Sequence, residues 1–145
     1  MFADFLKRLA APVPDPLPDD DARLALIALL VRVARSDGDY AEEERRMIGR
    51  IAAERFGLSP FEAQKLQAEA EALEAEAPDT VRFTRSIKDA VPYDERLGVV
   101  EALWKVVLAD GVRDDHENAL MRLAVNLLGV SDLDSGRARR RVEGG

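Results

Sequence analysis

The segment Asp37-Gly38-Asp39-Tyr40-Ala41-Glu42-Glu43-Glu44 decides the fold, because its arrangement returns at Asp110-Gly111-Val112-Arg113-Asp114-Asp115-His116-Glu117. In both copies a glycine follows an aspartate, and a glutamate comes six residues after the glycine. A nearly continuous apolar run precedes each copy and an amphipathic segment follows it. This agreement in order, spacing and flanking pattern is much stronger than a lone Asp-Gly, which usually marks only a turn. The chain therefore contains an internal repeat, over about residues 22–57 and 95–129.

Apolar residues recur at helical spacing along the chain, and no run alternates as a β-strand does. Residues 24–34 and 97–108 are apolar nearly all round, which predicts two central helices buried on several sides. Leu30 and Leu103 lie within these helices and should be equivalent and buried. At 145 residues the chain is a typical single domain. The sequence predicts an all-α, single-domain bundle of about 7–8 helices, built from two pseudo-symmetric helix-loop-helix repeats.

Capping residues mark the ends of several helices. Gly57 suits the C-cap of a helix over about residues 41–55. The stretch Ser59-Pro60-Phe61-Glu62 combines an N-cap serine, a proline at the first helical position and a glutamate two residues further on. It predicts a peripheral helix to about residue 77, with Phe61, Leu66 and Leu73 as its apolar stripe. Trp104 aligns with Val31 of the first copy and is expected to anchor the core.

The N-terminal part divides into two segments ahead of the helical domain, which spans residues 19–145. Residues 1–11 form an amphipathic helix with Phe2, Phe5, Leu6 and Leu9 on one face. Residues 12–18 contain four prolines and predict a semi-rigid, extended linker. The apolar face of residues 1–10 either folds back onto the domain or makes a weak peripheral contact with a membrane surface or a protein partner.

Composition excludes several classes of protein. The chain has no cysteine, which rules out disulfides and thiolate chemistry and favours a reducing compartment. A net charge of −7 argues against nucleic-acid binding, which needs clustered Lys and Arg. No stretch reaches the roughly 18–20 consecutive apolar residues of a membrane span. We expect a cytoplasmic protein that does not bind nucleic acid.

The repeated acidic loop is not a calcium-binding EF-hand. Counting Gly38 as the sixth position of such a loop places Val33 and Arg35 at the first and third ligand positions. The second copy places Val106 and Leu108 there. None of these four side chains supplies a carboxylate, so an EF-hand is excluded, although the order of helix, acidic loop and helix remains.

Helix capping gives one interpretation of the repeated acids. The glycine of each copy would end a helix in the left-handed conformation. Asp39 with Glu42, and Asp114 with Glu117, would then form capping boxes at the start of the next helix.

Charge compensation gives a second interpretation, and both stay open. Asp37 and Asp110 stand at helix C-termini, where the helix dipole disfavours an anion by roughly 0.3–1 kcal/mol. Asparagine or serine would cap without that cost. An acid at this place in both copies, followed each time by a glutamate seven residues on, implies a positive partner, which is either an arginine or a metal ion.

Residues 22–140 resemble the bacterial TerB-like family, named for tellurite-resistance proteins. The resemblance rests on two Asp-Gly-x5-Glu segments, each between a buried helix and an amphipathic one, and a short amphipathic N-terminus is typical of one branch of this family. The resemblance implies an all-helical domain with a metal site formed by the acidic residues of both repeats. The matching ligands are Asp37, Glu44, Asp110 and Glu117, with Asp39 and Asp114 as accessory residues. Carboxylate ligands without cysteine select a hard divalent cation such as Ca²⁺ or Mg²⁺.

The function implied is that of a noncatalytic, ion-responsive domain with a protein partner, in a stress-related or tellurite-resistance-related assembly. A purely structural helical adaptor, whose acids are helix caps, is the alternative. A metal-dependent hydrolase is the third hypothesis. Against it, His116 is the single histidine, and no Ser-His or Cys-His pair or glycine-rich phosphate loop can be assembled. We therefore expect no enzymatic activity.

Overall fold

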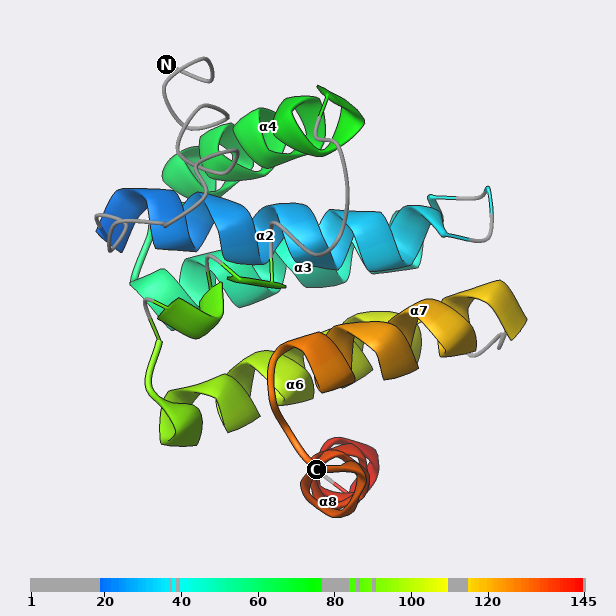
Figure 1. The fold of residues 1–145 in the computed structure, drawn as a ribbon. Coiled ribbons are helices and arrows are strands. Elements are labelled where there is room, and N and C mark those ends of the chain that lie inside the picture. The colour runs from blue at the N-terminus through cyan, green and yellow to red at the C-terminus, as the bar shows by residue number, and fades with distance from the viewer. Residues whose placement is uncertain are drawn as a thin grey trace.

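The computed structural model describes residues 19–36, 38, 40–76, 84–85, 87–89, 91–109 and 115–144, with only the backbone described at 19–22 and 115–117. All regular secondary structure in these ranges is helical, and the helices pack into one bundle (Figure 1). The predicted all-α bundle is therefore confirmed. The predicted N-terminal helix of residues 1–11 and the linker of residues 12–18 lie outside the described residues.

Six helices have both ends within the described ranges. They are α2 (Asp19–Arg35), α3 (Glu42–Phe56), α4 (Pro60–Glu76), α6 (Tyr93–Val107), α7 (Asp115–Leu127) and α8 (Asp132–Gly144). Residues 84–85 and 87–89 are also helical. None of the helices in the described ranges is long and apolar enough to cross a lipid bilayer.

Helices α2 and α6 form the centre of the bundle, as their apolar sequences predict. Every residue from Leu24 to Val31 is buried, and Leu30 and Leu103 each have 0% of their surface exposed. Helix α2 packs against α4, α3 and α6, while α6 packs against α8, α2 and α3 (Figure 1). Each central helix is thus covered by the helices that follow it in the chain, and the two central helices also pack against each other.

Two glycines end the second helix of each half in the same way. Gly57 after α3 has φ 63° and Gly129 after α7 has φ 75°, a left-handed conformation that glycine adopts without strain. In both cases the next amide donates to a carbonyl five residues back: Leu58 N to Ala53 O at 2.9 Å, and Val130 N to Val125 O at 3.1 Å. These bonds satisfy carbonyls that the helix end would otherwise leave unpaired.

The start of α4 is confirmed, but its predicted apolar stripe is partly wrong. Ser59 N–H donates to Glu62 Oε1 at 3.0 Å and Glu62 N–H donates to Ser59 Oγ at 3.2 Å, which completes a capping box. Phe61, however, is 75% exposed. The buried face of α4 is Ala63, Gln67, Ala70 and Leu73. Residue 61 lies about 200° around the helix from residue 63, so it points away from the core.

Trp104 is only partly buried, although the sequence predicts a core anchor. It packs against the core, and its indole Nε1–H donates to Ser135 Oγ of α8 at 3.1 Å. The polar edge of the indole therefore joins α6 to α8, while part of the ring stays at the surface.

Candidate functional site

The first acidic loop leaves α2 through a fixed turn. Ser36 Oγ donates to Val33 O at 2.7 Å, and Gly38 N–H donates to Arg35 O at 3.0 Å. Gly38 has φ 84°, so the left-handed conformation predicted for it is confirmed. The chain therefore turns sharply within three residues of the end of α2.

The loop enters α3 through Ala41 and not through Asp39 as the capping interpretation supposes. Ala41 is the N-cap of α3, and its N–H donates to Glu44 Oε1 at 3.3 Å. Glu42 does not fold back in this way. It is exposed and pairs with Arg46 at 3.3 Å. The capping box of Asp39 with Glu42 is therefore wrong, because the helix begins two residues later and Glu44 takes the capping position.

Glu44 is the one predicted ligand whose side chain is described, and it is fully buried, with 0% of its surface exposed. It is the third residue of α3, and Glu117 is the third residue of α7. Counted from the first residue of each helix, the two glutamates of the repeated motif thus have the same position. Burial of a carboxylate is costly unless hydrogen bonds or a cation compensate for its lost hydration.

The rest of the predicted ligand set lies outside the described residues. This applies to Asp37, Asp39, Asp110 and Asp114, and to the side chain of Glu117. Within the described part of the chain, no three His, Cys, Asp or Glu residues come close enough to hold a metal ion. The metal site therefore stays a prediction. The donor that is described fits a hard cation, since it is a carboxylate withdrawn from bulk water.

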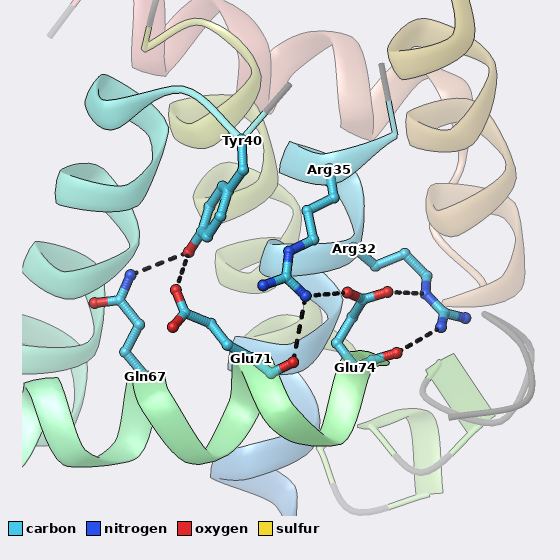
Figure 2. A network of polar contacts seen from close by, with 6 residues as sticks. All are labelled: Arg32, Arg35, Tyr40, Gln67, Glu71 and Glu74. Carbon is cyan, nitrogen blue, oxygen red and sulfur yellow. Dashed lines mark hydrogen bonds and ion pairs between the residues drawn. The ribbon is translucent and has the colours of Figure 1, made fainter. Parts of the chain in front are cut away.

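A network of polar side chains fastens the ends of this loop to α4 (Figure 2). Glu74 of α4 accepts from two arginines of α2: Arg32 Nε lies 3.1 Å from Glu74 Oε2, and Arg35 Nη1 lies 2.7 Å from Glu74 Oε1. The same arginines donate to the main chain of α4, at Glu74 O (3.2 Å) and Glu71 O (3.3 Å). One carboxylate thus holds both guanidinium groups at the end of α2.

Tyr40, at the exit of the acidic loop, joins the same network from the other side (Figure 2). Its hydroxyl donates to Glu71 Oε2 at 2.7 Å and accepts from Gln67 Nε2 at 3.2 Å. Burial, followed by the hydrogen bond to Glu71, raises the pKa of the Tyr40 phenol. The guanidinium carbons of Arg35 and Arg45 lie 5.1 and 4.7 Å from the ring centre, within the range of cation–π attraction.

Sequence reasoning missed this network. One signal in the sequence pointed to such a network: Arg32 interrupts an otherwise apolar run, and an arginine that is largely buried needs a hydrogen-bond acceptor. Glu71 and Glu74 lie three residues apart on α4 and therefore share one side of that helix. Periodicity alone does not show that this side of α4 faces the end of α2.

The sequence profile of the family described as tellurite resistance protein TerB matches residues 23–140. That range runs from the second turn of α2 into the last turns of α8. Comparisons with the curated proteins and with the solved structures give no match.

Proposed function

This chain belongs to the TerB family of tellurite resistance proteins, and we propose that its two acidic loops bind a hard divalent cation, Ca²⁺ or Mg²⁺. The ligands in this proposal are Asp37, Glu44, Asp110 and Glu117, with Asp39 and Asp114 as accessory donors. The domain is noncatalytic, and the ion changes how strongly its two halves hold together. It would act as an ion-responsive module of a stress-related or tellurite-resistance-related assembly.

One observation carries the proposal: a glutamate of the acidic motif is fully buried at the third position of α3, and the second motif places a glutamate at the third position of α7. Four carboxylates, some of them bidentate, can approach the roughly six to eight oxygens that Ca²⁺ takes. Without a cation, converging carboxylates would repel one another and destabilise the fold.

The positive partner that Asp37 requires is a second argument. Arg35 is the arginine closest to it in sequence, but its guanidinium binds Glu74 and the carbonyl of Glu71. This favours a metal ion over Arg35 as the compensating charge.

A structural adaptor is the second candidate, and the hydrogen bond from Ala41 N–H to Glu44 favours it. In this alternative the acids only cap helices. A hydrolase has weaker support, since the chain has no cysteine for a Cys-His pair and a single histidine, His116, that could serve as a general base.

Calorimetric titration of Ca²⁺, Mg²⁺ and Mn²⁺ into chelator-treated protein tests the proposal. We expect an affinity tighter than millimolar, and an increase in stability of about 2.7 kcal/mol at a free ion concentration of 100 times Kd. Asp37→Asn and Asp110→Asn should both weaken binding. Asp132→Asn is the matched control, because Asp132 is an exposed acid at the start of α8. Binding that is equally strong in both loop variants would refute the site.

Glu44→Gln separates a metal ligand from a helix cap. The glutamine amide oxygen can still accept from Ala41 N–H, so a purely structural cap should tolerate the change with a loss below about 1 kcal/mol. A metal ligand should lose affinity, because the charge is gone. Unchanged affinity in this variant would favour the adaptor.

A further inference from the structure

Among the grooves on the surface of the described residues, two lie between helices that follow each other in the chain. The first lies between α3 and α4 and has a volume of about 510 Å³. The second lies between α7 and α8, beside Trp104, and has a volume of about 340 Å³. Both volumes fall in or near the range of binding pockets for small molecules and side chains. A third groove, of about 530 Å³, lies between α3, the end of α6 and α8, and Arg50 lines it as well.

The two grooves are built from corresponding residues. Gly57 and Gly129, which end α3 and α7 with the same left-handed turn, are 72 residues apart. All eight residues of α7 and α8 that line the second groove lie 72 residues after a residue that lines the first. On α3 and α7 the corresponding pairs include Gly49 with Met121, Arg50 with Arg122, and Ala53 with Val125.

The helices that follow repeat this correspondence. On α4 and α8 the pairs include Ala63 with Ser135, Gln64 with Gly136, and Gln67 with Arg139. Helix α4 covers α2 as α8 covers α6. The repeated unit therefore extends over three helices, α2 to α4 and α6 to α8, and not only over the two helices that flank each acidic loop.

We infer that each three-helix unit presents an equivalent groove that binds an acidic segment of a partner protein through Arg50 in the first unit and Arg122 in the second. The inference rests on the paired grooves and does not require a metal in the acidic loops.

Charge is the first argument for this occupant. Among the residues lining both grooves, arginine is kept at the position of Arg50 and Arg122 although the neighbouring side chains differ. Both arginines are exposed, and neither forms a hydrogen bond or ion pair with another described residue. Each guanidinium is thus available to a carboxylate, which it can bind with two parallel hydrogen bonds.

The surroundings of each arginine fit a peptide. Gln64 adds an amide to the first groove and Asn118 adds one to the second. Small or apolar side chains, among them Ala53 and Val125, lie beside these polar groups. A peptide with acidic and apolar residues can satisfy both features at once.

Shape and net charge disfavour other anionic ligands. The lining of the first groove extends along α3 from Glu42 to Ala53, which is about 16 Å of helix axis. This length suits a peptide better than a compact phosphate. Nucleic acid is disfavoured by the net charge of −7 of the whole chain.

The test uses the full chain and synthetic amphipathic peptides of roughly ten residues, which as a helix span about 15 Å. One peptide carries glutamates beside leucines, and its analogue carries glutamine in place of glutamate. Fluorescence anisotropy of labelled peptide measures total binding. Trp104 is the single tryptophan and lines the second groove, so its emission with unlabelled peptide reports occupancy of that groove alone.

We expect the acidic peptide to bind and its glutamine analogue to bind at least about tenfold more weakly. Arg122→Gln should remove the change in Trp104 emission, whereas Arg50→Gln should keep it and lower total binding. Arg140→Gln is the matched control, because Arg140 is exposed on α8 and lines neither groove. It should bind as the parent does.

Gln64→Glu and Gly136→Glu are independent variants that place a carboxylate at corresponding positions of the two grooves, and each should weaken binding in its own groove. Circular dichroism checks that every variant is folded. Equal binding of the two peptides would overturn the inference, as would an equal loss in Arg140→Gln. Displacement of the peptide by inorganic phosphate at the same concentration would assign the grooves to small anions instead.

Discussion

Glu74 should contribute strongly to the stability of the bundle, because its single carboxylate accepts from two arginines of α2. Its side chain is 12% exposed and that of Arg32 is 16% exposed, so their ion pair is largely shielded from water, whereas Arg35 is 34% exposed. Hydrogen bonds to charged groups contribute about 1.5–3 kcal/mol each, and the more exposed pair counts for less. We expect Glu74→Ala to lower the free energy of unfolding by about 2–4 kcal/mol.

Urea denaturation at neutral pH, followed by circular dichroism, measures this loss. Glu76→Ala is the matched control, because Glu76 is exposed in the last turn of the same helix, and it should change stability by less than about 0.5 kcal/mol. Replacing Arg32 by Met in the Glu74→Ala background should recover part of the loss, since the buried charge is then removed as well. A loss below about 1 kcal/mol for Glu74→Ala, or equal losses in both single variants, would refute the assigned role of the network.

Two further predictions concern the core and the pH dependence of stability. Leu30→Ala and Leu103→Ala should each lower the free energy of unfolding, measured by urea denaturation, by about 2–5 kcal/mol, because both side chains are fully buried. Leu133→Ala, at an exposed position, is the control. Losses below about 1 kcal/mol at both core sites would contradict the central position of α2 and α6. The raised pKa of Tyr40 means that the folded state favours the neutral phenol. This preference stabilises the fold fully below the usual tyrosine pKa near 10, and the stabilisation is lost as the pH rises above that value. Between about pH 8 and about pH 11, the parent should therefore lose stability more steeply than Tyr40→Phe; parallel losses would show that Tyr40 does not cause the dependence.

Local sequence signals predicted most of the fold. The uninterrupted apolar run of residues 24–31 requires burial on several sides, and that segment is buried throughout. Ser59 and Gly57 act through their own neighbours, so their caps could be predicted without knowing the tertiary structure. The prediction that Phe61 lies on the buried face of α4 is wrong. Most of that face consists of alanines and Gln67, whose side chains give little hydrophobic periodicity.

The candidate site was predictable only in part. The repeated spacing marks Glu44, and the family resemblance implies that it is a metal ligand; the structure shows that its side chain is buried. Its capping bond to Ala41 depends on where α3 begins, and helix starts are uncertain by a residue or two from sequence alone. The network around Glu74 depends on how α4 crosses α2, which is a tertiary property that periodicity does not encode. The correspondence of the two grooves could not be predicted from the sequence, because it depends on where α3 and α7 end and on which helices pack beside them.

The contact between Gly49 and Gln67 shows how the two grooves could acquire different partners. A side-chain carbon at position 49 would lie 3.0 Å from Gln67 Oε1, so glycine there leaves room for the Gln67 amide between α3 and α4. Met121 stands at the corresponding place in the second, smaller groove. Exchange of one residue at this position would alter the width of one groove without touching the other. If both grooves bind peptides as proposed, the repeat lets the specificity of each groove change separately while the shared core stays the same.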